Sequence, residues 1–157
     1  MNGVAIAMAV HVLAIVWWIG GVAMVTTVLL PKAREFADPK EGLAIFQKIE
    51  GGFARQARAA TLLAAFSGFY MVDHLALWPY FLAPAYWWLD AMVFVWALFT
   101  LVLFVAEPLF LHRWLALQAS RSPGRTLALL HRLHWIVLLL SLITVFGAAA
   151  GSHGLSM

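Results

Sequence analysis

Histidine is the residue type in this chain with the broadest chemistry, and six histidines are present beside no cysteine. The lack of cysteine excludes disulfides, thiolate metal sites, iron–sulfur clusters and haem attached covalently through a C-x-x-C-H motif. His11 lies inside an apolar run, from Gly3 to Pro31, that contains no Lys, Arg, Asp or Glu. An ionisable side chain inside such a run needs a partner, so His11 indicates a functional site.

The histidines form two groups when residues are counted outward from the cytoplasmic ends of the expected membrane spans. The outer group is His11, His74 and His153, and the inner group is His112, His131 and His134. Helical bundles build cofactor sites from side chains on facing helices, and imidazoles among apolar and aromatic side chains suit the iron of haem b. We therefore expect an outer haem iron held by His11 with His74 or His153. A second, inner haem iron would be held by His112 with His131 or His134.

Two methionines repeat a spacing that suits copper. Met8 and His11 are three residues apart, as are Met71 and His74, so each pair shares one helix face. Thioether and imidazole groups are suitable ligands for Cu(I). Copper is therefore the alternative to haem, although methionine is also a common filler of apolar cores.

Charged side chains near the inner ends of the spans extend the haem hypothesis. Arg55, Arg58 and Arg132 could pair with the carboxylates of an inner porphyrin. Glu107 lies at the end of a span, where it would relay protons with an inner-group histidine or form an ion pair with Arg132. Of these two roles for Glu107, we favour the ion pair.

The composition is that of an integral membrane protein. Hydrophobic residues make up 64% and charged residues 11% of the 157 residues, against about 45–50% and about 25% in soluble domains. The length suits one small bundle, with residues 1–157 as a single transmembrane domain. Phosphate-binding loop, Rossmann, nucleophile-elbow and H-E-x-x-H motifs are absent from the sequence, which argues against hydrolases and nucleotide-driven functions.

Four hydrophobic segments predict an all-α, integral membrane four-helix bundle. The spans cover about residues 3–30, 57–78, 86–107 and 130–150, which is long enough to cross a bilayer. All ten Lys and Arg residues lie in two segments, residues 32–58 and 113–132, and the positive-inside rule places both in the cytoplasm. Both termini then lie on the outer, periplasmic side of a bacterial inner membrane. The basic residues need no nucleic-acid partner.

The remaining segments carry weaker signals. The first span lacks a basic n-region and a convincing cleavage site, so we interpret it as a retained span. Residues 40–58 have helical periodicity and are expected to run into the second span, with Gly51-Gly52 as a weak point. The loop of residues 77–88 is rich in proline and aromatic residues, which is typical of an interfacial belt.

The opening of the chain resembles a known family. His11, Trp18 and Gly21, followed by Leu30-Pro31-Lys32, resemble the first span of the HemJ type of protoporphyrinogen oxidase. The stretch from Phe46 to Gly68 looks like the second element of that family. CopD-like copper-resistance membrane proteins share the same opening, and the resemblance lies mainly in residues 8–70.

The resemblance implies a small membrane bundle that binds haem b, with His11 as an expected ligand. The chain lacks the lysine that this family carries early in span three, where it reads Trp88 to Met92. It also lacks the tyrosine–histidine pair that follows the Leu-Pro element in the family. The resemblance therefore implies haem binding by the scaffold more directly than it implies porphyrinogen oxidation.

Taken together, the residues and the resemblance predict a haem b protein that exchanges electrons with a quinone, a small oxidant or a partner cytochrome. Three alternatives stay open: a HemJ-like protoporphyrinogen IX oxidase, a CopD-like copper-binding or transport protein, and an accessory subunit of a membrane redox complex. The expected partners are the lipid bilayer, a quinone or porphyrin, and a second copy of the chain or a larger complex.

Overall fold

The structure is a computed structural model that describes residues 2–152, with the side chains of residues 2, 110–112 and 152 left out. Every regular element in this range is helical, which confirms the all-α prediction. The elements are α1 (Asn2–Met24), η1 (Val25–Leu29), α2 (Leu30–Arg34), α3 (Pro39–His74), η2 (Trp78–Tyr80), η3 (Pro84–Tyr86), α4 (Trp87–Thr100), η4 (Leu101–Leu111), α5 (His112–Arg121) and α6 (Pro123–Ser152). Of these, η1 and η4 are π-helical.

Three helical stretches are long and apolar enough to cross a membrane. They are Gly3–Arg34, Pro84–Leu109 and Pro123–Gly151. The second predicted span, residues 57–78, lies mostly within α3, which is helical to His74 but is not among these three. A membrane crossing by α3 therefore stays a prediction.

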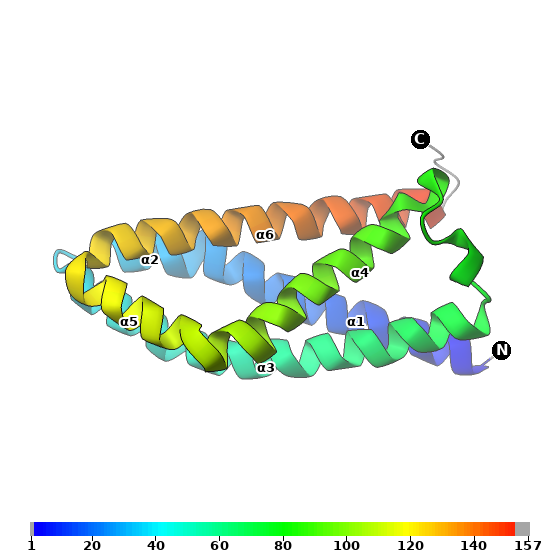
Figure 1. The fold of residues 1–157 in the computed structure, drawn as a ribbon, viewed down its shortest axis with the longest axis horizontal. Coiled ribbons are helices and arrows are strands. Elements are labelled where there is room, and N and C mark those ends of the chain that lie inside the picture. The colour runs from blue at the N-terminus through cyan, green and yellow to red at the C-terminus, as the bar shows by residue number, and fades with distance from the viewer. Residues whose placement is uncertain (1, 153–157) are drawn as a thin grey trace.

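The long helices run along one common direction (Figure 1). Helices α1 and α3 pack side by side, and α4 packs against α6. Helix α4 starts beside the end of α6 and crosses diagonally towards the middle of α3, and α5 then returns to the start of α6 (Figure 1). The two ends of the described chain lie at the same end of the molecule, and the turns that precede α3 and α6 lie at the other.

Helix α3 runs through the segment predicted to be helical, residues 40–58, and on to His74, and it starts at an aspartate cap. The Asp38 side chain accepts a hydrogen bond from the backbone N–H of Lys40 at 2.9 Å, and Pro39 occupies the first helical position. An aspartate cap and a proline at that position both favour a helix start. The helix passes through Gly51-Gly52 without a break, so the weak point does not end it.

Small residues allow the helices to approach closely. The buried face of α3 carries Ala54, Ala57, Ala60 and Ala64, and Gly21 of α1 lies where a Cβ would overlap a neighbouring phenylalanine ring. On α6, Gly147 and Gly151 receive the rings of Trp87 and Trp88, and a Cβ at either glycine would overlap them. Small residues with this role are common where membrane helices pack.

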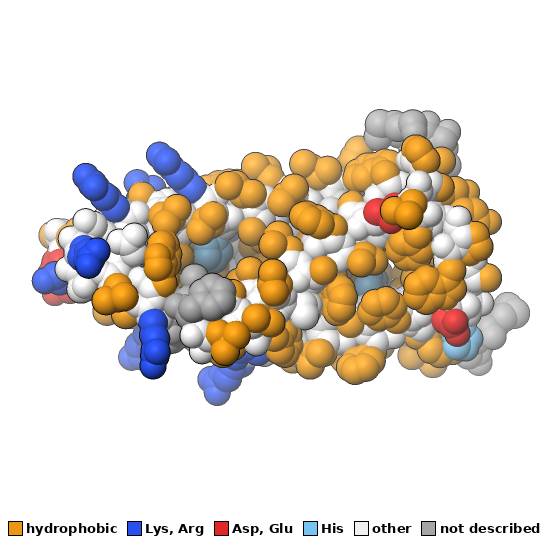
Figure 2. Space-filling model, viewed as in Figure 1, with side chains coloured by type: hydrophobic (Ala, Val, Ile, Leu, Met, Phe, Trp, Pro, Cys, Tyr) orange, Lys and Arg blue, Asp and Glu red, His pale blue; other side chains and the backbone are white. Residues whose placement is uncertain are grey.

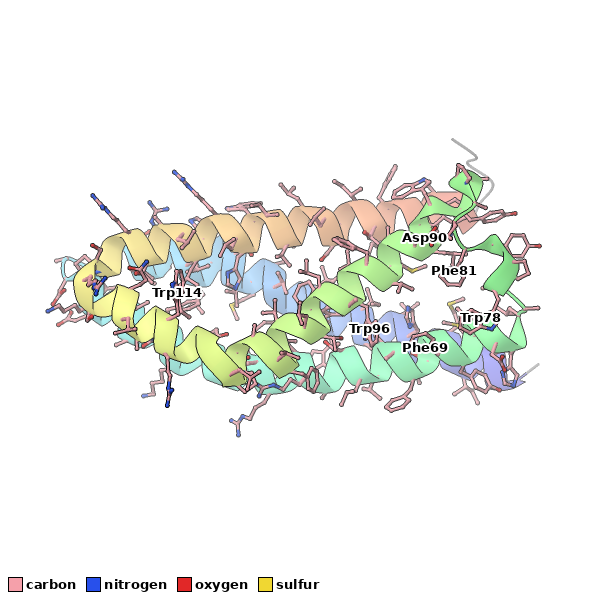
Figure 3. The ribbon with its side chains drawn as sticks, in the orientation of Figure 1. Phe69, Trp78, Phe81, Asp90, Trp96 and Trp114 are labelled. Atoms are coloured by element: carbon pink, nitrogen blue, oxygen red, sulfur yellow. The ribbon has the colours of Figure 1, made fainter. Side chains whose placement is uncertain are left out.

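Two tryptophans tie α4 to its neighbours at mid-length. Trp18 of α1 packs edge-on against Phe99, with ring centroids 4.5 Å apart. Trp96 donates to the backbone oxygen of Thr61 at 3.2 Å and packs edge-on against Phe69 of α3 (Figure 3). These contacts hold α4 against the α1–α3 pair at the middle of the molecule.

The aromatic loop before α4 is fixed by one carboxylate. Leu82 has a positive φ of 63°, and its backbone N–H donates to Asp90 at 3.1 Å. Trp78 and Phe81 lie in the same loop at the end of the molecule (Figure 3). Asp90 therefore stabilises a turn that a leucine adopts rarely.

Candidate functional site

His11 lies at the interface between α1 and α3. It shares a face of α1 with the buried residues Ala14 and Trp18. Its Nδ1 lies 3.0 Å from the backbone oxygen of Ala64 and 3.1 Å from Ser67 Oγ. The ring packs over Gly68, where a Cβ would come within 3.2 Å of the His11 Cε1.

These contacts set the tautomer of His11. The Ser67 hydroxyl donates to the backbone oxygen of Leu63 at 2.6 Å, so its oxygen is left to accept, and the Ala64 carbonyl is an acceptor only. His11 Nδ1 therefore carries the hydrogen and donates to both oxygens. Its Nε2 is then a lone pair, and it makes no hydrogen bond within the described part of the chain. Metal-ligating histidines are commonly oriented in this way by a carbonyl at the other nitrogen.

His74, one of the two predicted outer partners of His11, is not brought to it. His74 is exposed at the end of α3, where its ring stacks on Tyr70 at 3.8 Å and its Nδ1 lies 3.1 Å from the Tyr70 oxygen. Ser67, which contacts His11, and His74 are two helical turns apart, about 10 Å along the axis of α3. His11 and His74 therefore lie at different levels along the helices, which we call separate layers. His153 lies outside the described residues.

Among the inner histidines, His134 has the same local arrangement as His11. Its Nδ1 lies 2.9 Å from the backbone oxygen of Leu130, and its ring packs edge-on against Phe46. Its Nε2 makes no hydrogen bond among the described residues. His112 begins α5, and its side chain is outside the description. Phe46 and Ser67 lie about 30 Å apart along α3, so His11 and His134 belong to different layers.

His131 is engaged at both ring nitrogens. Nδ1 lies 3.1 Å from a guanidinium nitrogen of Arg34, and Nε2 lies 3.0 Å from the backbone oxygen of Thr26 in η1. A guanidinium only donates, so Nδ1 accepts and Nε2–H donates to Thr26. The Trp135 indole nitrogen also lies 3.0 Å from Nε2, but it needs the opposite tautomer.

A proline explains why Thr26 needs this donor. In η1 the backbone N–H of Leu30 bonds to the oxygen of Val25, five residues earlier, as in a π-helix. In the same register the oxygen of Thr26 would bond to residue 31, which is proline and has no N–H. His131 supplies the missing donor. It is therefore a structural side chain rather than a free metal ligand.

Arg58 plays the equivalent part at η4. Its Nε donates to the backbone oxygen of Leu103 at 3.0 Å, and Pro108, five residues further on, has no N–H to offer that oxygen. Its Nη2 lies 3.1 Å from a carboxylate oxygen of Glu107, whose side chain is only 14% exposed. Glu107 thus pairs with Arg58 and not, as expected, with Arg132.

The other predicted site residues are spread over the molecule. Arg55 is exposed on α3. Met8 is 49% exposed, whereas Met71 is 8% exposed on the buried face of α3, one turn beyond Ser67. No group of three or more His, Asp or Glu side chains gathers within the described residues.

Sequence reasoning missed three polar residues near the middle of the bundle. Ser67 orients His11. The Trp18 indole nitrogen and the Thr100 hydroxyl are buried without a hydrogen-bond partner in the described structure, and Thr100 follows the phenylalanine that packs on Trp18. Residue counts along α1 and α3 place Ser67 at about the level of His11, but they do not show that the two side chains face each other.

A shallow groove of about 340 Å³ runs over α1 and α3 beside His11. Its lining is Gly3, Ile6, Ala7, Val10, Leu63, Phe66, Ser67 and Tyr70. The lining is almost wholly apolar, and Ser67 links it to the His11 ring. The Tyr70 hydroxyl lies over Gly3, where a Cβ would overlap it.

In comparisons with known proteins, no family model, no curated protein and no solved structure matches this chain. The site is therefore interpreted from its own geometry. It offers an oriented imidazole in an apolar helix interface, and two buried polar groups without a partner among the described residues, the Trp18 indole and the Thr100 hydroxyl, lie further along the helices.

Proposed function

We propose that this chain is a membrane-embedded haem b protein with a redox role, in which Nε2 of His11 is one axial ligand. The arrangement of Nδ1 carries the proposal: it donates to Ala64 and Ser67, which leaves Nε2 as a lone pair inside an apolar helix. Metal-ligating histidines commonly hold the other ring nitrogen on a carbonyl in this way.

The donor chemistry of the bundle fits a haem. The macrocycle needs apolar and aromatic surroundings, and its carboxylates need hydrogen-bond donors. The Trp18 indole N–H and the Thr100 hydroxyl are buried donors that lack an acceptor within the described residues. Arg58 is a poorer candidate for a carboxylate, because Glu107 already neutralises it. Bound haem would supply one-electron chemistry between ferrous and ferric iron.

We place α3 as a fourth span, with both termini on the outer side of a bacterial inner membrane. Helix α3 packs along α1, and the Lys and Arg side chains gather at the end of the molecule opposite the termini (Figure 2). That distribution supports a cytoplasmic location for the basic end. The ion pair of Arg58 with Glu107 removes much of the cost of burying α3 in lipid.

An electron partner that dissolves in lipid suits this site. The groove over α1 and α3 is apolar, and its lining includes Ser67, which touches His11. A quinone would approach along this groove with the quinone tail in the bilayer. The quinone carbonyl would accept a hydrogen bond from the Tyr70 hydroxyl at the groove edge. A small oxidant or a partner cytochrome would not need the groove.

An optical spectrum tests the haem assignment. Protein expressed with ample haem and purified in detergent should show a reduced-minus-oxidised spectrum of the b type, with haem quantified as pyridine haemochrome. His11→Ala should remove or shift the spectrum, whereas His74→Ala, an exposed histidine in another layer, should leave it unchanged. A colourless wild-type protein, or a spectrum unaffected by His11→Ala, would overturn the proposal.

Copper is the second candidate, favoured by the buried position of Met71 one turn beyond Ser67. Thioether and imidazole ligands would select Cu(I). Metal analysis should then find stoichiometric copper that Met71→Leu removes and Met8→Leu, at an exposed position, retains. Porphyrinogen oxidation, which the family resemblance implies, is tested separately by rescue of a strain that lacks protoporphyrinogen oxidase.

A further inference from the structure

Arg125 and Arg132 flank an open hollow on one face of α6. The two arginines, with Ala128 and Leu129, line a hollow of about 250 Å³ on α6. Both arginines are exposed, and neither guanidinium has an ion pair or hydrogen bond within the described residues. Arg34, Lys32 and Arg58 are engaged by His131, Glu35 and Glu107. Other exposed basic side chains such as Arg55 share the lack of a partner among the described residues, but they do not line this hollow.

The depth of the hollow matches a lipid headgroup layer. His131, next to Arg132, bonds to Thr26 of η1, and the apolar run of the first span ends a few residues later at Lys32. This part of α6 therefore lies where the hydrophobic surface gives way to the basic end of the molecule (Figure 2). Arginines at this boundary face phosphate groups on one side and acyl chains on the other.

We propose that Arg125 and Arg132 form a binding site for the phosphate of an anionic phospholipid. The two residues are two helical turns apart, about 10 Å along the axis, and their side chains are long enough to converge on one phosphate. Guanidinium groups bind phosphate oxygens through paired hydrogen bonds. Leu129 and Ala128 offer the apolar contact that an attached glycerol and acyl chain needs. The site is independent of haem.

The test is retention of lipid by the full-length protein. Protein is reconstituted in vesicles of equal parts phosphatidylglycerol and phosphatidylcholine, extracted gently, and examined by native mass spectrometry for bound lipid. Wild type should retain phosphatidylglycerol in preference to phosphatidylcholine. Arg125→Gln/Arg132→Gln should lower that preference at least about tenfold, because the phosphate loses its charge-assisted hydrogen bonds to both guanidinium groups.

Two further variants separate a built site from diffuse attraction. Arg113→Gln/Arg121→Gln removes the same charge from exposed positions on α5 and should lower the preference clearly less, because only diffuse attraction to the anionic surface is lost. Ala128→Phe keeps both arginines but fills the hollow, and it should also lower the preference. An equal loss in the α5 variant, or full retention in Arg125→Gln/Arg132→Gln or in Ala128→Phe, would overturn the site. Displacement of the lipid by inorganic phosphate alone would overturn its assignment to a lipid.

Discussion

Each of the two π-helical segments has a backbone oxygen that lacks its usual N–H donor, and a different side chain supplies the donor in each. In each, a proline withholds the N–H that a carbonyl five residues earlier would accept. At η1 the Thr26 oxygen receives the ring N–H of His131, and at η4 the Leu103 oxygen receives Nε of Arg58. An imidazole does this without a formal charge, whereas a guanidinium brings a charge that Glu107 must balance.

This difference has a consequence for where each segment can lie. The hydrogen bond from His131 at η1 adds no formal charge to the first apolar stretch. The Thr26 residue that receives it is buried among apolar residues. The arginine contact at η4 requires an acid and a base at the same level, and it places them near the end of the apolar stretch Pro84–Leu109. We therefore expect the loss of the Arg58 contacts at η4 to cost more stability than the loss of the His131 contact at η1. Without Arg58, both the Glu107 carboxylate and the Leu103 oxygen lose their partner.

The largest effect is expected from Arg58→Gln. It leaves Glu107 without its partner at 14% exposure and weakens the contact with Leu103, a loss of about 3 kcal/mol for a broken buried pair. Unfolding in a denaturing-detergent titration, followed by circular dichroism, measures it. Arg55→Gln, an exposed arginine one turn earlier on α3, is the control and should change little. Arg58→Gln/Glu107→Gln should recover part of the loss, because the stranded charge is gone.

His131→Phe should have a smaller effect. An aromatic ring is kept, although a somewhat larger one, but the Thr26 oxygen loses its donor, which costs about 1–2 kcal/mol for an unsatisfied carbonyl in an apolar setting. Hydrogen–deuterium exchange should rise at the backbone of residues 25–34 and stay unchanged in η4. Faster exchange in η4 alone would contradict the separation of the two segments.

Hydropathy was sufficient to predict the helices but not these contacts. The apolar runs, the Asp38-Pro39 start of α3 and the depth of His11 follow from local sequence. The partner of Glu107 depends on α4 crossing from α6 to α3. This is tertiary packing, which residue spacing in the sequence does not predict. Pro31 and Pro108 are visible in the sequence. Which backbone oxygen each proline leaves without a donor, however, depends on whether the helix has α or π hydrogen bonding. The acceptor in the two patterns differs by one residue.

The site was predicted in part for the same reason. Counting residues assigns depth along each helix, and it singled out His11 as an ionisable group inside a span. It cannot tell which face of a helix meets which neighbour. His74 was therefore grouped with His11, although its ring stacks on Tyr70 two turns away, and Ser67 was overlooked.

A proline replacement offers a direct comparison of the two segments. Pro108→Ala restores an N–H for the Leu103 oxygen, so Arg58→Gln should destabilise the Pro108→Ala protein by about 1 kcal/mol less than it destabilises wild type. The remaining loss is the part due to Glu107. Pro31→Ala should lessen the effect of His131→Phe in the same way, and more completely, because no stranded charge remains there. Equal effects of Arg58→Gln with and without Pro108 would show that the carbonyl contact contributes nothing.

The smallest expected effect, from Trp135→Phe, tests the tautomer on which the comparison depends. Trp135 is 41% exposed, and its indole N–H competes with Thr26 for Nε2 of His131. Arg34 donates to Nδ1 and so leaves the hydrogen on Nε2, where it serves Thr26. Removing the indole N–H should then change the free energy of unfolding by less than about 0.5 kcal/mol, with exchange in η1 unaltered. If Trp135→Phe lowered stability as much as His131→Phe, the Nε2 of His131 would be a hydrogen-bond acceptor for the indole. The Thr26 oxygen in η1 would then have no side-chain donor, unlike the Leu103 oxygen in η4.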